Sequence, residues 1–160
     1  MRVLFLPGLL VAALLLQVTV LDLIRVAGVK PDLVLILVVF NALLRGQLRG
    51  ALWGFGAGLM VDIATGDYFG LNALVQMAVG YLAGLARTRL YVDSGVMAAV
   101  VTLLVSLSGG VVHYLLLAYV DISISPGIAL LKVIFPGAVY NAFTALLLSK
   151  WFYRTEPLLS

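Results

Sequence analysis

Cysteine is absent from this sequence of 160 residues, and histidine occurs only once, at His113. The absence of cysteine excludes disulfide bonds, thiolate chemistry and cysteine-ligated metal sites. One histidine also leaves too few ligands for a structural zinc site of the usual cysteine and histidine type. We therefore expect neither a metal ion nor any other cofactor.

Charged residues are also scarce, at 11% of the chain, against about 25% in soluble domains. Hydrophobic residues make up 64% of the sequence, and the mean hydropathy is +1.18. This composition predicts an all-α integral membrane protein. A spanning helix needs about 20 apolar residues, so the chain has room for at most six or seven, and we expect about six. We expect residues 1–160 to form a single polytopic transmembrane domain.

The sequence also lacks the motifs of the common enzyme classes. It contains no HExxH segment, no phosphate-binding loop and no serine, histidine and aspartate set at one depth in the membrane. The net charge of +3 comes from a few scattered basic residues, so a nucleic-acid partner is not expected. We therefore expect a protein that is not an enzyme.

Six apolar segments predict six helices, at residues 3–23, 33–44, 51–65, 71–86, 96–120 and 128–150. A signal peptide is an alternative for the first segment. We favour a retained helix, because the segment is longer than a usual signal core and no small-residue cleavage site follows it. The second and third segments are short for a span. Either Arg45 and Arg49 extend them by snorkelling, or the pair forms a re-entrant hairpin.

The distribution of basic residues predicts the orientation in the membrane. With six crossings, one side receives most of them: Arg2, Arg45, Arg49, Arg87, Arg89, Lys150 and Arg154. The other side receives Arg25 and Lys30, with Lys132 just inside a helix. Because loops rich in lysine and arginine remain in the cytoplasm, both termini should be cytoplasmic.

Glycines recur every fourth residue in the third segment, at Gly50, Gly54 and Gly58. Residues four apart share one face of a helix, so these glycines form a smooth stripe that ends near Asp62. In a membrane such a stripe lets another helix approach closely. The stripe is therefore a candidate for packing against an internal neighbour or for binding the helix of a partner.

Polar residues concentrate in the half of the bundle away from the termini. By predicted depth they include Asp62, Asn72, His113 and Lys132. Polar groups are expensive in lipid, so these four residues are candidates for lining a cavity that opens to the outside. The alternative is that they satisfy one another or snorkel to the headgroups. Asp62 and Lys132 have similar depth, and we expect them to pair directly or through water.

Residues 31–74 strongly resemble the MreD family of rod shape-determining proteins. The segment reads PDLVLILVVFNALLRGQLRGALWGFGAGLMVDIATGDYFGLNAL. The resemblance lies in the Pro-Asp that opens the second helix, the arginine-glycine turn, the GxxxGLxxD pattern and the Gly-Leu-Asn-Ala that follows. Residues 139–142, Val-Tyr-Asn-Ala, are also similar to that family. Length, helix number and predicted orientation agree over the whole chain.

The resemblance implies a non-enzymatic scaffold subunit of the bacterial elongation complex, located in the cytoplasmic (inner) membrane among its lipids. It implies direct binding to MreC and a role in lateral peptidoglycan synthesis and cell shape. The wider complex would contain RodA, a cross-linking transpeptidase and MreB. The family is also similar to the substrate-binding S-components of energy-coupling-factor transporters, which implies their fold for this chain.

Two other functions fit parts of the sequence. The first is a small-molecule binding subunit of a transporter, such as a vitamin-binding subunit. Against it, the first helix lacks the Ala-xxx-Ala patch of those subunits, because Leu16 and Gln17 follow Ala12 and Ala13 at the fourth position. The second is an ion-coupled carrier that uses Asp62 and His113. The absence of an internal repeat argues against a carrier.

Overall fold

The computed structural model describes residues 2–20, 23, 25, 28–66, 68–90, 94–120 and 125–159, with side chains from residue 7 to residue 154. Its elements are α1 (Arg2–Thr19), α2 (Leu33–Arg45), α3 (Gln47–Thr65), α4 (Leu71–Arg89), α5 (Gly95–Tyr119), α6 (Pro126–Ile128), the π-helical η2 (Ala129–Ile134) and α7 (Phe135–Leu159). The last three continue one another as a single long helix. The described residues thus form six helical segments and no strand, which confirms the all-helical class predicted from the sequence.

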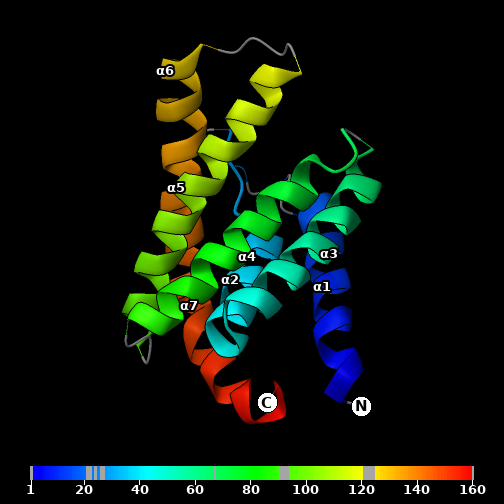
Figure 1. Ribbon diagram of the computed structural model, residues 1–160, viewed down its shortest axis with the longest axis vertical. Coiled ribbons are helices and arrows are strands. Elements are labelled where there is room, and N and C mark those ends of the chain that lie inside the picture. The colour runs from blue at the N-terminus through cyan, green and yellow to red at the C-terminus, as the bar shows by residue number, and fades with distance from the viewer. Residues whose placement is uncertain are drawn as a thin grey trace.

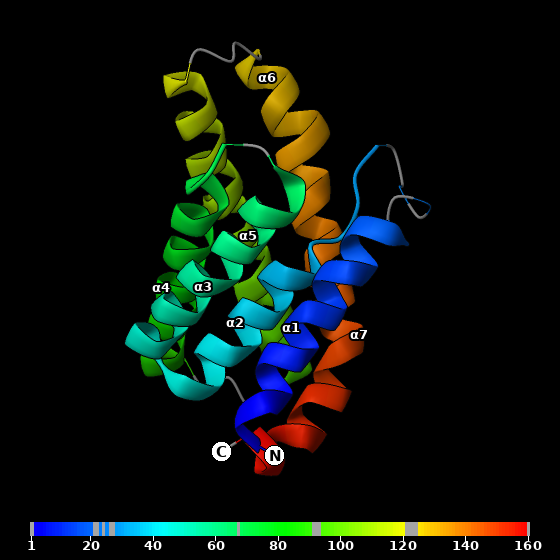
Figure 2. The ribbon, with the colours of Figure 1, turned by 90° about the vertical axis from the view of Figure 1, so that its right-hand side faces the viewer.

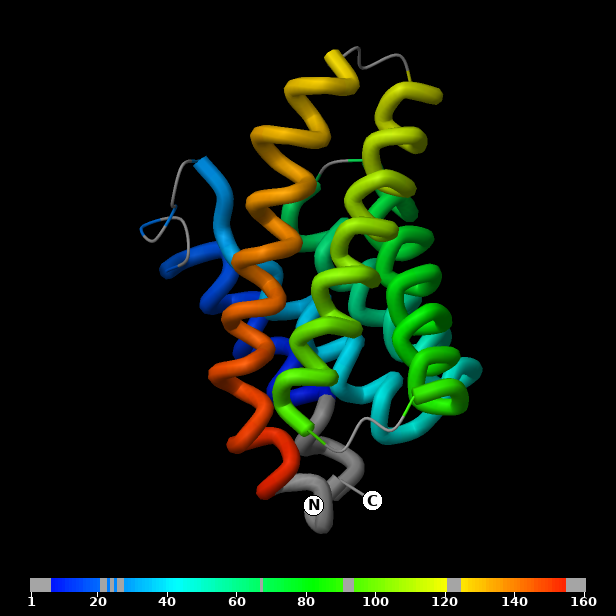
Figure 3. Tube along the Cα trace, turned by 90° about the vertical axis from the view of Figure 1, so that its left-hand side faces the viewer, coloured from blue at the N-terminus to red at the C-terminus, as the bar shows by residue number. Residues whose placement is uncertain are grey.

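The helices form one elongated bundle with both chain termini at the same end (Figure 1). The end of α5 and the start of α6 lie at the opposite end (Figure 2). α5 and α7 run side by side along the length of the bundle, with α4 next to α5 (Figure 3). The short α2 contacts α1, α3, α4, α5 and α7, and most of its residues are buried. α2 is therefore the central helix of the bundle.

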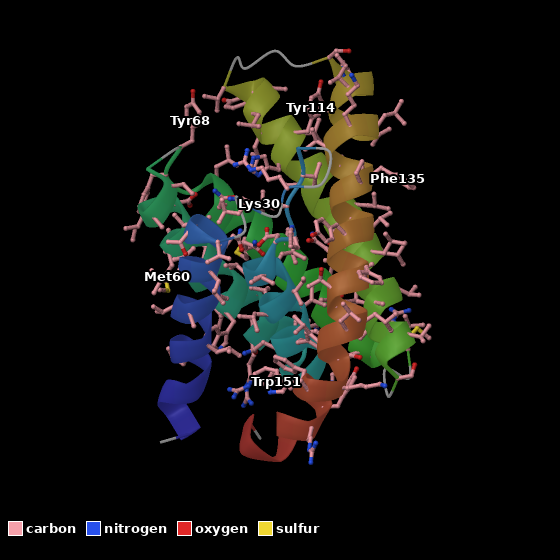
Figure 4. All side chains as sticks on the ribbon, turned by 180° about the vertical axis from the view of Figure 1, so that it is seen from behind. Lys30, Met60, Tyr68, Tyr114, Phe135 and Trp151 are labelled. Carbon is pink, nitrogen blue, oxygen red and sulfur yellow. The ribbon has the colours of Figure 1, made fainter. Side chains whose placement is uncertain are left out.

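Two helical segments are long and apolar enough to cross a membrane, at Gly95–Tyr119 and Pro126–Arg154, with mean hydropathies of 2.1 and 1.5. Their outward faces carry many large apolar side chains. Phe135, for example, projects away from the bundle (Figure 4). Contiguous apolar surface of this extent is rare on soluble monomers. It is the surface that a lipid-facing helix needs.

α2 is too short to match these spans. Its 13 residues correspond to about 20 Å at about 1.5 Å per residue, against about 30 Å for the hydrocarbon core of a bilayer. At its C-terminus, Gly46 alone connects α2 to α3, with a φ of 88° that favours glycine. At its N-terminus, α2 begins among other helices. The free N–H groups of its first turn must therefore be bonded by protein groups.

α3 and α4 pack backbone to backbone along the glycine stripe. Gly50, Gly54 and Gly58 are all buried. A Cβ atom on Gly50 would lie 2.6 Å from the carbonyl oxygen of Gly80, and one on Gly54 would overlap the carbonyl group of Gln76. Any side chain there would force the two helices apart. The stripe therefore packs against an internal neighbour and is covered by α4.

We expect Gly54→Ala to lower the free energy of unfolding by about 1–3 kcal/mol, because the added methyl group overpacks the α3–α4 contact. Gly56→Ala is the matched control two residues away on α3, where a Cβ atom would meet nothing within 4 Å. It should leave stability unchanged or raise it by up to about 1 kcal/mol through helix propensity. Unfolding of the purified variants in detergent measures both effects. Equal stability of the two variants would contradict the close contact.

Candidate functional site

A cavity of about 320 Å³ lies between the start of α2 and the helices α4, α5, η2 and α7. Its apolar walls include Val75 of α4, Leu117 of α5 and Ile134 of η2. Its polar lining comes from three helices, α4, α5 and α7, and from the residue that precedes α2. It consists of Asp32, Asn72, Gln76, Ser106, His113, Tyr114 and Asn141. Such a combination of apolar walls and a few convergent polar groups is typical of a small-molecule site.

The π-helical segment η2 forms one wall of the cavity through Ala129, Val133 and Ile134. It lies just before Pro136, which has no N–H to donate to the carbonyl group four residues earlier. Short π-helical insertions within α-helices are common at functional sites. On the facing helix, Gly110 lies against Ile134, where a Cβ atom would come within 2.7 Å of Cγ2. Here α5 and η2 touch, and they close one side of the cavity.

The N-terminus of α2 forms the floor of the cavity. Asp32 is its N-cap residue, and its Oδ1 accepts a hydrogen bond from the Leu35 N–H at 2.9 Å. The Val34 N–H donates to Gln17 Oε1 at 3.2 Å. The Asp32 N–H donates to Asn141 Oδ1 at 2.7 Å. Side chains from α1 and α7 therefore satisfy backbone donors at this helix end.

The same network extends to α4 and α5. Asn141 Nδ2 donates to Ser106 Oγ at 3.2 Å, and Gln76 Nε2 donates to Asp32 Oδ2 at 3.4 Å. Gln76 Oε1 is buried without a hydrogen-bond partner among the described residues. The floor therefore offers an unmet hydrogen-bond acceptor at Gln76 Oε1.

Asp62 lies outside this cavity and serves another helix end. Its side chain is 1% exposed and faces the N-terminus of α4. Its oxygens accept hydrogen bonds from the N–H groups of Gly70 at 2.9 Å, Asn72 at 3.1 Å and Ala73 at 3.2 Å. The Asn72 Nδ2 adds a fourth bond at 3.0 Å. Because Gly70 has no side chain, Asp62 of α3 caps α4 in its place.

Of the four residues expected to share a cavity, the structure brings two together. Asn72 and His113 line it, whereas Asp62 and Lys132 do not. Lys132 is exposed on the outer face of η2 and forms no ion pair with Asp62. Their depths were inferred from position along each helix. The rotation of η2 about its axis turns Lys132 outward, and position alone does not determine that rotation.

Sequence reasoning missed five polar lining residues: Asp32, Gln76, Ser106, Tyr114 and Asn141. A spacing signal was present, because Asn72 and Gln76 are four residues apart and therefore share one face of α4. Asp32 was recognisable only as the residue before a helix. That it lies beside Asn141, 109 residues later, depends on tertiary packing.

The described lining holds one serine hydroxyl, and that hydroxyl belongs to the hydrogen-bond network of the floor. Ser106 Oγ accepts a hydrogen bond from Asn141, and no general base is bonded to it among the described residues. The described residues contain no group of three or more His, Asp or Glu side chains that could hold a metal ion.

Tyr114, which also lines the cavity, lies in the upper part of the molecule, toward the end opposite Trp151 (Figure 4).

The chain matches the protein family described as rod shape-determining protein MreD over residues 1–155. Among curated proteins and among solved structures, none matches it. The likeness to energy-coupling-factor subunits that the sequence suggested therefore has no support from solved structures.

We expect Asp62→Asn to lower the free energy of unfolding by about 1–3 kcal/mol. Both carboxylate oxygens of Asp62 accept hydrogen bonds from the start of α4, whereas an amide has only one acceptor oxygen. Lys132→Met should be nearly neutral, because Lys132 is exposed. The double variant should equal the sum of the two within about 0.5 kcal/mol, as for independent sites. Detergent unfolding of the three variants measures the coupling. A coupling above about 1 kcal/mol would instead establish the Asp62–Lys132 pair.

Proposed function

Because the chain belongs to the MreD family of rod shape-determining membrane proteins, we propose that it is a non-enzymatic scaffold subunit of the bacterial elongation complex. In this proposal it binds MreC directly and supports lateral peptidoglycan synthesis. RodA, a transpeptidase and MreB belong to the wider complex. The observation that carries the proposal is the family match, which extends from α1 through most of α7.

The packing of the bundle supports a scaffold. The glycine stripe of α3 is covered by α4, and the Asp62 carboxylate accepts hydrogen bonds from the N-terminus of α4. Both features therefore have structural roles within the chain. The helix of a single-span partner would bind to the apolar outer faces of the bundle, since the stripe is covered.

We expect the tagged chain, co-expressed with MreC of the same bacterium, to retain MreC through purification in detergent. MreC with its span replaced by an unrelated apolar helix should be lost, because short loops leave the membrane as the main contact region. Recovery of MreC regardless of its span would contradict binding within the membrane.

A transporter subunit is the second candidate, and the 320 Å³ cavity favours it. The same co-purification distinguishes the two functions. A scaffold should retain MreC, whereas an energy-coupling-factor subunit should retain a pair of ATPases through their coupling protein. Retention of the ATPases in place of MreC would overturn the scaffold proposal.

We also propose that the chain crosses the inner membrane several times with both termini in the cytoplasm. The end of α2, the start of α3 and the end of α4 lie at the same end of the bundle as the termini (Figure 2). These helix ends carry Arg45, Arg49, Arg87 and Arg89. The positive-inside rule assigns such an end to the cytoplasm.

Single cysteines test this orientation cleanly, since the chain has none of its own. Leu48→Cys and Tyr119→Cys suit the test, because the native side chains are 70% and 89% exposed at opposite ends of the bundle. A membrane-impermeant maleimide should label position 119 in spheroplasts and position 48 only after permeabilisation. The reverse pattern would place the termini outside.

A further inference from the structure

We propose that the cavity between α4, α5 and α7 binds a small organic cation that carries N–H donors, with Asp32 and Gln76 as the recognition groups. This inference goes beyond the scaffold function and does not depend on it. The ligand would place its ammonium group at the floor of the cavity and its carbon skeleton against the apolar walls.

The first observation is an unmet acceptor. Gln76 lines the cavity, is 3% exposed and donates through Nε2 to Asp32 Oδ2. Since an ionised carboxylate only accepts hydrogen bonds, this contact fixes the orientation of the amide. Gln76 Oε1 is left without a partner among the described residues. Buried amide oxygens are almost always hydrogen-bonded in folded proteins. An N–H donor from a ligand would satisfy this one.

The second observation is an acidic group that pairs with no lysine or arginine among the described residues. Asp32 lines the cavity, and it forms no ion pair with any described residue. No lysine or arginine is among the lining residues. Lys30, nearby in sequence, donates to the Gln17 carbonyl group at 3.2 Å. A carboxylate inside a membrane protein is expensive unless it is paired, so a bound cation would stabilise it.

The other titratable groups on the lining are His113 and Tyr114. His113 is close enough to interact electrostatically with Asp32 and with Asp62, but it forms no hydrogen bond with another described residue. Its protonated form would compete with a cationic ligand for Asp32. An anionic ligand would find no lysine or arginine here, and the amide of Asn141 is already bonded at both ends.

The shape of the site sets the size of the ligand. A volume of about 320 Å³ is at the lower limit of small-molecule sites. The walls formed by Val75, Leu117, Val133 and Ile134 are apolar. The probe should therefore combine one ammonium group with a compact apolar body, as benzylammonium does.

The experiment is calorimetric titration of the purified full-length chain in detergent with benzylammonium chloride. We expect saturable binding with a Kd of about 1 mM or tighter, an ordinary affinity for a fragment of this size. Benzyl alcohol has the same body without the charge, and benzyltrimethylammonium has the charge without N–H donors. Both should bind at least about tenfold more weakly, because charge-assisted hydrogen bonds would be lost.

Variants of the chain test the recognition groups. Asp32→Asn keeps an acceptor for the Leu35 N–H and removes the charge, and Gln76→Met removes the amide at similar size. Each should weaken benzylammonium binding about tenfold or more. Asn41→Leu is the matched control. Asn41 Oδ1 is also buried without a partner in the described part of the chain, but Asn41 lines a separate pocket of about 10 Å³. It should leave binding unchanged, and His113→Gln should not weaken it.

Several results would overturn the proposal. Absence of saturable benzylammonium binding to the folded chain is the first. Unchanged binding to both folded variants, Asp32→Asn and Gln76→Met, is the second. Equal or tighter binding of benzyl alcohol is the third, and it would assign the cavity to a neutral ligand. None of these results bears on MreC capture, so failure here is distinct from failure of the scaffold function.

Discussion

The architecture depends on how backbone N–H groups are satisfied where helices begin inside the bundle. A helix end in water is solvated at no cost, but a buried one needs protein acceptors. α2 begins among other helices, and Asp32, Gln17 and Asn141 supply or receive the bonds there. α4 begins at a glycine, and Asp62 reaches it from α3. Each solution recruits residues from elsewhere in the chain, so the polar groups at these two helix ends also hold the helices in their relative positions.

The glycine contact between α3 and α4 also positions Asp62 to cap α4. Because Gly50, Gly54 and Gly58 have no side chains, the backbones of α3 and α4 approach closely along their length. That approach brings Asp62, four residues after Gly58, to the first turn of α4, where a negative charge is favoured by the helix dipole. The stripe therefore does more than increase van der Waals contact. It determines how far along α3 the carboxylate must lie to reach the neighbouring helix end.

Much of this fold could be predicted from the sequence. Apolar runs gave the six helices, and the four-residue glycine spacing gave a face suited to close packing. Depth along each helix grouped Asn72 with His113, and both line the cavity. It failed for Lys132, because a side chain at the right depth faces the cavity only if its helix is turned that way. It also failed for Asp62, since three of its four hydrogen bonds come from backbone donors, which have no sequence signature. Long-range pairs such as Asp32 with Asn141 arise from packing alone.

The π-helical segment also determines which face α7 presents to the bundle. A π-helical turn accommodates one residue more than an α-helical turn, so it rotates every later residue by about 100° relative to an uninterrupted α-helix. Asn141 lies seven residues beyond η2, at the level where α2 begins. Without the extra residue a different side chain would occupy that position, and the Asn141 amide would turn away from the start of α2. The register of the whole C-terminal helix is thus set by six residues, Ala129–Ile134, on the wall of the cavity.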